Sequence, residues 1–241
     1  MAEATFRFHG KLVHFLAPER RAGFFSHGCA RAATVKNAIE SLGVPHTETG
    51  RLTVNGQPAT LDRIVRENDA IEIFAHEAGV VGDEPLLFLA DAHLGGLARF
   101  LRMLGFDTLY DNAYDDREIL RLAVRDRRAV LTRDRELLKC REIARGCFVH
   151  ELKPEAQLRE VAARFGLAKR MRPFTLCLHC NLSLEALERS VALAHVPPGI
   201  AQRYEAFVRC PGCKRVYWEG SHWERMREML GASLSVSIPR A

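Results

Sequence analysis

The stretch LLFLADAHLGGLARFLRMLGFDTLYD, residues 86–111, decides the fold of this chain. Its first six residues predict a buried strand that ends at Asp91, GGLARFLRMLGF predicts a helix, and DTLYD predicts a second strand. Apolar side chains recur at helical spacing along the middle part, so one face of the helix can cover a sheet. These side chains are Leu94, Leu97, Ala98, Leu101 and Leu104.

Strands and helices continue to alternate after this stretch. The pattern predicts a helix in DREILRLAVRD, a strand in AVLTRD, a helix in RELLKCREIA, a strand in CFVHEL and a helix in PEAQLREVAARFGL. Short connections between parallel strands and helices favour right-handed crossovers. The predicted fold class is therefore α/β with a parallel sheet.

Aspartates follow three of the predicted strands. Asp91 ends the first and Asp134 ends AVLTRD, while Asp115 and Asp116 come after DTLYD. Because the carboxyl ends of parallel strands meet at one edge of a sheet, we expect these carboxylates to converge. Converging carboxylates repel one another unless a cation lies between them, and oxygen ligands favour Mg²⁺ or Mn²⁺. Such an ion suits phosphodiester hydrolysis.

A structural role is the alternative for each aspartate. Asp116 and Asp134 precede predicted helices, where aspartate is a favoured N-cap, and Asp91 can cap a loop. The grouping of the three at one sheet edge favours function. Asp115 and Glu118 are candidates to assist or replace Asp116.

Three segments carry a resemblance to a known family: FLADAHLGGLARFLRMLGFD, DDREILRLA and RAVLTRDRELL. They resemble the PIN-like RNase domain of the Mut-seven C-terminal type. The resemblance implies divalent-metal ribonuclease activity, with Asp91, Asp116 and Asp134 as the acidic residues and Thr132 as part of a Thr-x-Asp motif. Thr132 can orient a water molecule or a carboxylate, although a β-branched residue at a strand end is also ordinary packing.

Arginines flank the predicted acidic site and can hold phosphate oxygens, because a guanidinium group matches their geometry. The candidates are Arg99, Arg102, Arg133 and Arg135. On helices, at least half of such side chains are expected to point to solvent.

The first segment, residues 3–76, has a different pattern. TFRFHGKLVHFL predicts two short strands or a hairpin, and a helix follows with Thr34 as N-cap and Gly43 just past its end. RLTVNGQPA predicts a strand with an Asn-Gly turn, and NDAIEIFA a last strand. The segment resembles the β-grasp, ubiquitin-like fold of sulfur carriers. Because the chain continues past it without a free Gly-Gly end, we expect a docking or structural module.

Two Cys-x-x-Cys pairs form the strongest short motif of the chain. Cys177 and Cys180 make the first and Cys210 and Cys213 the second, and together they furnish the four thiolates of a structural Zn²⁺. Four unrelated buried thiols are the alternative. A closed four-thiolate site predicts a stabilising role, with an inserted helix in SLEALERSVALA between the pairs.

Charge and composition indicate which partners and which cellular location the protein can have. Residues 151–241 carry fourteen basic and nine acidic side chains, whereas residues 1–80 and 81–150 are balanced. Basic and aromatic residues near the cysteines suit single-stranded RNA, although a small ribbon also needs aromatics for its own core. No apolar run reaches the roughly 20 residues of a membrane span, and the start lacks the plan of a signal peptide, so we expect a cytoplasmic protein.

The predicted organisation is a β-grasp domain (1–78), a linker (79–85), a PIN-like nuclease domain (86–168) and a zinc-ribbon module (169–241). The leading hypothesis is a Mg²⁺- or Mn²⁺-dependent endoribonuclease that binds RNA, with a protein partner for the β-grasp domain and no membrane partner. Phosphoryl transfer through an aspartyl nucleophile fits less well, because His93 stands where a second aspartate is wanted. A non-enzymatic RNA- or protein-binding adaptor is the other alternative.

Overall fold

The computed structural model describes residues 1–79 and 85–238. The chain divides into two compact units, Met1–Val80 with Asp115–Val149 and Val81–Tyr114 with His150–Ala241. Most of the linker predicted at residues 79–85 lies outside the described residues. Among the described helices, none is both long and apolar enough to cross a bilayer.

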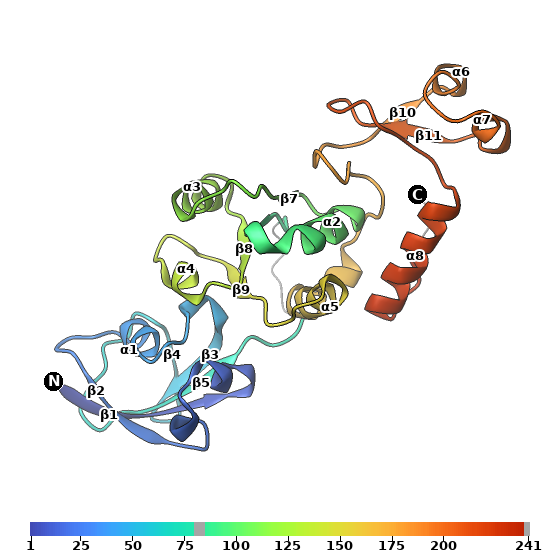
Figure 1. Cartoon of the computed structure of the whole chain (residues 1–241). Coiled ribbons are helices and arrows are strands. Elements are labelled where there is room, and N and C mark those ends of the chain that lie inside the picture. The colour runs from blue at the N-terminus through green and yellow to red at the C-terminus, as the bar shows by residue number, and fades with distance from the viewer. Residues whose placement is uncertain (80–84, 239–241) are drawn as a thin grey trace. The chain divides into compact units, whose positions relative to one another are not determined.

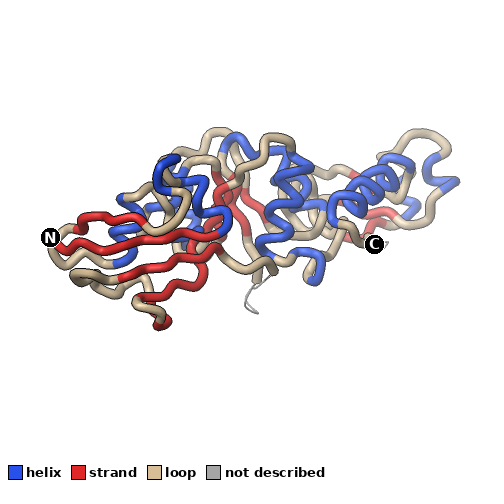
Figure 2. The backbone as a smooth tube through the Cα atoms, turned by 90° about the horizontal axis from the view of Figure 1, so that it is seen from below, coloured by secondary structure: helices blue, strands red, loops and turns tan. Residues whose placement is uncertain are grey.

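A five-stranded sheet builds the N-terminal part of the first unit (Figures 1 and 2). Its order is β2-β1-β5-β3-β4, with β1 and β5 parallel at the centre and the other pairs antiparallel. The strands are β1 (Ala2–His9), β2 (Phe25–Cys29), β3 (Thr49–Val54), β4 (Gln57–Ala59) and β5 (Ala70–Ala75). This mixed sheet with one helix is the β-grasp-like arrangement that the sequence predicted.

Helix α1 (Val35–Ser41) provides the apolar side chains that cover this sheet. Thr34 caps it as predicted, since its hydroxyl accepts from the Asn37 N–H at 3.2 Å. Ile39 is completely buried and belongs to the same core as Phe6 and Ile73 of the sheet. The apolar periodicity of the segment therefore determines which helix face meets the sheet.

The prediction of a hairpin around His9–Lys11 is wrong. Gly10 adopts a φ of +63°, and the chain enters a 3₁₀ helix over Gly10–Phe15 instead of returning as a strand. This turn buries Leu12 and Phe15 in the core. The antiparallel partner of β1 is β2, which lies further along the chain. The Asn55-Gly56 turn between β3 and β4 is present as predicted, with both residues at positive φ.

The rest of the first unit alternates helices with strands. Its elements are α3 (Asp116–Asp126), β8 (Ala129–Thr132), α4 (Arg135–Lys139) and β9 (Gly146–Phe148). Strands β8 and β9 are parallel, as the α/β pattern predicts. Helix α4 is shorter than predicted, because the backbone becomes extended at Cys140 and then turns to bury Ile143.

The second unit begins with β6 (Phe88–Ala90), α2 (Gly95–Met103) and β7 (Thr108–Leu109), and continues after residue 149 with α5 (Pro154–Phe165). Strands β6 and β7 are parallel. Helix α2 buries Leu97, Ala98 and Leu101 on the predicted face. The Phe88 ring meets the Phe165 ring edge-on at 5.2 Å, so α5 helps to cover this strand pair.

The C-terminal segment of this unit is a small antiparallel ribbon with two short helices and one longer helix. Its elements are β10 (Glu185–Leu187), α6 (Arg189–Ala192), α7 (Ile200–Arg203), β11 (Phe207–Arg209), β12 (Val216–Tyr217) and α8 (Ser221–Leu234). The helix predicted over SLEALERSVALA is only partly correct. Its first half pairs with β11 as a strand, because its backbone groups find partners there, and only Arg189–Ala192 is helical.

Candidate functional site

Asp134 lies in the turn between β8 and α4. Its Oδ1 accepts from the N–H groups of Glu136 at 2.7 Å and Leu137 at 3.4 Å, so Asp134 is the N-cap of α4. The Thr132 hydroxyl, fully buried at the strand end, accepts from the Asp134 N–H at 2.9 Å. Within the described residues Oδ2 of Asp134 makes no hydrogen bond, so this rigid turn presents a carboxylate oxygen that can bind a cation.

Asp115, not Asp116, caps α3. The Asp115 carboxylate accepts from the Glu118 N–H at 2.8 Å. Asp116 is the exposed first residue of the helix, and its carboxylate makes no hydrogen bond or ion pair among the residues described. Glu118 is paired with Arg121 at 2.6 Å, and this hydrogen bond lowers the pKa of Glu118. The contacts therefore leave Asp116 available and give its two acidic neighbours structural roles.

Asp116 and Asp134 both act electrostatically on the thiol of Cys140. Burial raises the pKa of Cys140, and nearby carboxylates raise it further, among them those of Asp116 and Asp134. The two side chains come from the first turn of α3 and the turn before α4. Two carboxylates from separate elements therefore both contribute negative charge at the same thiol.

Asp91 follows β6 directly and belongs to the second compact unit. Its Oδ1 accepts from the Ala92 N–H at 2.6 Å, which caps a 3₁₀ helix over Ala92–Leu94. The Tyr110 hydroxyl donates to the Ala92 carbonyl at 3.0 Å and fixes this turn. A Cβ at Gly95 would lie 2.6 Å from the Tyr110 hydroxyl, so the close approach requires glycine.

Of the arginines predicted to hold substrate, Arg99 and Arg135 are exposed. Arg133 is half-buried and donates to the Val149 carbonyl at 3.0 Å. Arg102 does not face a ligand site, in contrast to the prediction that it holds substrate. It is buried, and its guanidinium donates to the carbonyls of Thr108 at 2.9 Å, Leu178 at 3.2 Å and His179 at 3.0 Å. These contacts give Arg102 a structural role, because its donors bind the backbone instead of facing a ligand.

Arg102→Met is expected to destabilise the protein by about 2–4 kcal/mol, because it leaves buried carbonyls without donors. The exposed Arg99→Met is the matched control on the same helix and should change stability by less than about 0.5 kcal/mol. Urea unfolding of both variants measures the difference. Equal stabilities would contradict the structural role of Arg102.

The four cysteines of the two Cys-x-x-Cys pairs come together. Their Sγ atoms all lie within 4.8 Å of one another, and Cys177 and Cys213 are 3.7 Å apart. All are free thiols, and Cys177 and Cys210 are buried. Tetrahedral zinc with Zn–S bonds of about 2.3 Å separates sulfur ligands by about 3.8 Å, so the arrangement fits this ion. The four-cysteine group can therefore hold a structural zinc.

The two cysteine pairs have matching backbone geometry. In each, the residue after the second cysteine has positive φ and its N–H donates to the carbonyl of the first: Asn181 to Cys177 at 2.9 Å and Lys214 to Cys210 at 3.0 Å. The Tyr217 hydroxyl lies 3.2 Å from the Cys177 Sγ. Burial raises the pKa of Cys177, but hydrogen bonds from Tyr217 and the Cys180 N–H outweigh it and hold that pKa at about 6.

Asn181 is a positioning residue that the sequence analysis missed. Its side chain accepts from the Thr108 N–H at 2.9 Å and donates to the Asp107 carboxylate at 2.6 Å, which joins the first cysteine pair to the start of β7. The available signal was its place directly after a Cys-x-x-Cys pair, where the backbone needs a residue that tolerates positive φ.

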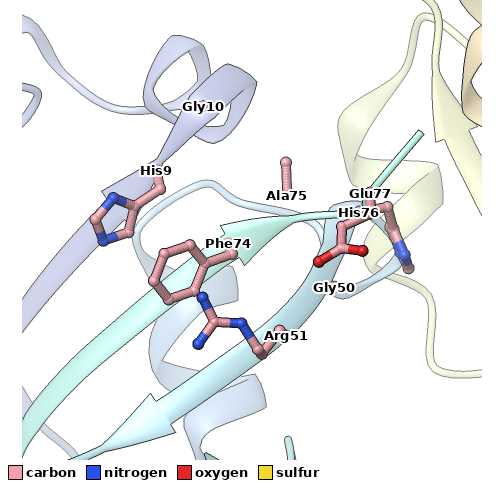
Figure 3. A pocket seen from close by; sticks show the side chains of 8 residues that line it. All are labelled: His9, Gly10, Gly50, Arg51, Phe74, Ala75, His76 and Glu77. Carbon is pink, nitrogen blue, oxygen red and sulfur yellow. The ribbon is translucent and has the colours of Figure 1, made fainter. Parts of the chain in front are cut away.

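A separate hollow of about 380 Å³ lies on the N-terminal sheet (Figure 3). The His9 ring stacks on Phe74 with centroids 4.1 Å apart, and the Arg51 guanidinium lies 3.9 Å from the centroid of the same ring. These three side chains come from β1, β5 and β3, which are neighbours in the sheet. The hollow thus combines the Phe74 ring with the Arg51 guanidinium and a stacked histidine ring.

The family model described as Mut7-C RNAse domain matches residues 87–230, more than half of the chain. The chain belongs to the Mut7-C RNAse domain family. A second model, described as Mut7-C ubiquitin, matches residues 1–80. The resemblances read from the sequence are therefore confirmed, for the RNase domain and for its ubiquitin-like domain alike. The RNase match indicates a nuclease-like function and includes the four-cysteine segment.

Two solved structures are similar to part of this Mut7-C RNAse domain protein. The crystal structure of H. volcanii small archaeal modifier protein 1 is 17% identical, covers 31% of this chain and 98% of its own, and has a TM-score of 0.26. The crystal structure of SAMP1 from Haloferax volcanii is 17% identical, covers 34% and 99% respectively, and has the same TM-score of 0.26. No curated protein matches the chain.

Proposed function

We propose that this chain is a divalent-metal-dependent ribonuclease in which Asp91, Asp116 and Asp134 hold Mg²⁺ or Mn²⁺. The observation that carries the proposal is that Asp116, in the first turn of α3, and Asp134, in the turn before α4, each have carboxylate oxygens without a partner among the described residues. Oxygen donors of this kind suit a hard divalent ion. The match to the RNase family supplies the substrate class.

Asp91 is the third proposed ligand of the ion. It directly follows β6, as Asp134 closely follows β8, and residues at the carboxyl ends of parallel strands meet at one edge in open α/β sheets. A divalent ion held there supplies activation of water and stabilisation of charge on the phosphate. The Asp91 and Asp134 carboxylates are each held by a capping hydrogen bond, so the local orientation of each is set before an ion binds.

Other residues support this site without holding the ion. Thr132 fixes the Asp134 turn through the Asp134 N–H, and Asp115 fixes the start of α3, so both are positioning residues. Arg99, Arg133 and Arg135 are proposed to bind phosphate oxygens of the RNA, because guanidinium groups pair with them well. Arg102 is not among them.

Cleavage of labelled single-stranded RNA tests the proposed activity. The purified chain is incubated with Mg²⁺, with Mn²⁺ or with neither, in buffer that contains trace zinc so that the cysteine group stays loaded. Fragments are expected only when Mg²⁺ or Mn²⁺ is present. Binding of RNA without cleavage under any of these conditions would favour the adaptor alternative.

We propose that the four-cysteine group binds zinc and that this ion stabilises the fold, since four thiolates leave no position for a substrate.

For the ubiquitin-like domain we propose a docking role, with the hollow around Phe74 as the contact surface for a protein partner. The domain also has structural contacts. The Glu48 carboxylate accepts from the Phe148 N–H of β9 at 2.7 Å, and the rings of Phe15 and Phe148 meet edge-on.

A further inference from the structure

The C-terminal segment contains a second hollow, of about 450 Å³, that the sequence analysis did not predict. It is lined from β11, β12, α7 and the start of α8, which are the orange and red elements of Figure 1. Its volume is within the roughly 300–1,000 Å³ range of small-ligand sites. None of the proposed metal ligands lines it, so it is a feature separate from the acidic site.

Five aromatic rings lie in the walls of this hollow. They belong to Phe174, Tyr204, Tyr217, Trp218 and Trp223. Trp218 and Trp223 are the only tryptophans of the sequence. Aliphatic side chains such as Leu176 and Ile200 complete the lining. A flat apolar group that can stack on rings therefore fits the walls better than a branched or highly polar ligand.

The walls are fixed before any ligand binds. Trp223 is only 6% exposed, and its ring centroid lies 4.7 Å from that of Phe174. A Cβ at Gly220 would lie 2.7 Å from the Trp218 Nε1, so glycine allows the indole to pack against the backbone. The Tyr217 hydroxyl is held by the Cys177 Sγ at 3.2 Å. Preformed walls lower the ordering cost of binding.

Charge at the rim indicates the kind of ligand. Exposed Arg203 and His222 line the hollow together with the partly exposed Glu219, and the Arg227 guanidinium lies 5.3 Å from the centroid of the Trp223 ring. The segment that contains the hollow carries the basic excess of the whole chain, fourteen basic against nine acidic side chains over residues 151–241. An apolar hollow with Arg203 in its lining, in a segment with a basic excess, complements a flat base attached to a negatively charged backbone.

We propose that this hollow binds an unstacked base of single-stranded RNA. The choice of RNA rests on the proposed ribonuclease function, and the binding itself does not depend on the acidic site. The base stacks against the aromatic walls, while Arg203 pairs with a neighbouring phosphate. None of the proposed metal ligands lines the hollow, so its proposed role is in substrate binding and not in the chemical step.

Intrinsic fluorescence tests this proposal, because both tryptophans line the hollow. The full chain with Asp91→Asn, which prevents cleavage, is titrated with a short single-stranded oligouridylate and with an abasic oligomer that has the same number of phosphates. Saturable quenching by the oligouridylate, at least about tenfold tighter than by the abasic oligomer, is the expected result. Equal affinity for the two oligomers overturns the proposal, since phosphates alone would then explain binding.

Substitutions test whether RNA binds in this hollow. Trp218→Ala is expected to weaken RNA binding about tenfold, measured by anisotropy of a labelled oligomer, and Trp218→Phe to restore most of it. Ala206→Phe fills the hollow without removing a wall and should weaken binding similarly. Phe24→Ala removes an exposed aromatic side chain elsewhere and is the matched control. Unchanged affinity in both Trp218→Ala and Ala206→Phe, with zinc content and circular dichroism intact, overturns the proposal.

The results that would reject the proposed ribonuclease function differ from those that would reject RNA binding in the hollow. If the wild-type chain cleaves no RNA but base-dependent quenching occurs, the hollow is supported and the nuclease proposal fails. If Asp91→Asn abolishes cleavage but RNA quenches neither tryptophan, the nuclease proposal is supported and the hollow is overturned. In an active enzyme, Trp218→Ala should raise KM about tenfold and leave kcat nearly unchanged, because the contact is made equally in the bound and transition states.

Discussion

Asp134→Asn is expected to lower the rate of RNA cleavage at least about 100-fold, because even residues that only support metal ligands contribute 10–100-fold to activity. Asparagine has nearly the shape of aspartate and caps helices equally well, so the bonds from Glu136 and Leu137 to this side chain can persist. The substitution therefore removes the negative charge and spares the turn. Single-turnover cleavage in saturating Mn²⁺ measures the effect.

The same loss is expected for Asp91→Asn and Asp116→Asn. Asp111→Asn is the matched control, since Asp111 is an exposed loop residue whose carboxylate accepts from the Ala113 N–H, a bond that asparagine can also accept. It should retain full activity. Thermal unfolding of all four variants shows whether any loss is due to folding. Wild-type activity in either Asp91→Asn or Asp134→Asn would disprove the proposed shared ion.

Cys177→Ser is expected to remove bound zinc and to lower Tm by about 10 °C or more, because a structural zinc contributes several kcal/mol to folding. Cys177 is completely buried at the centre of the cluster, and its pair is joined to β7 through Arg102 and Asn181. Loss of the ion therefore loosens the edge of the α/β segment as well as the ribbon. Metal analysis and calorimetry measure the two effects.

Cys140→Ser is the matched control for this prediction. Its thiol lies outside the four-cysteine group and is only partly exposed, so the substitution alters a comparable side chain without removing a ligand. Zinc content should stay at the wild-type level and Tm should change by no more than about 2–4 °C. A Cys177→Ser protein that kept both its zinc and its Tm would refute the assignment of these thiols as ligands.

Local features were readable from the sequence because they depend on neighbouring residues. The helix with Thr34 as N-cap, the Asn55-Gly56 turn and the alternation of strands and helices all follow from spacing and turn chemistry. The paired cysteines predicted their own convergence, since a Cys-x-x-Cys turn presents both thiols on one side. The family resemblance was readable for the same reason, because its motifs are continuous stretches.

Other features required the tertiary structure. Arg102 and Arg99 are equivalent in the sequence pattern, but only the fold shows that Arg102 meets carbonyls more than seventy residues away. Asp115 and Asp116 are equally plausible caps until the helix start is fixed. The aromatic hollow joins Phe174 to residues of α7, β12 and α8, so no local pattern could reveal it.

The sequence by itself determined the alternation of strands and helices between residues 86 and 168, the cysteine centre and the set of acidic candidates, since each depends on residue type and short-range spacing. The tertiary structure decided which polar side chains are occupied by backbone partners and which remain available for a ligand. That distinction depends on burial and on contacts between distant segments, and these are set only when the chain packs.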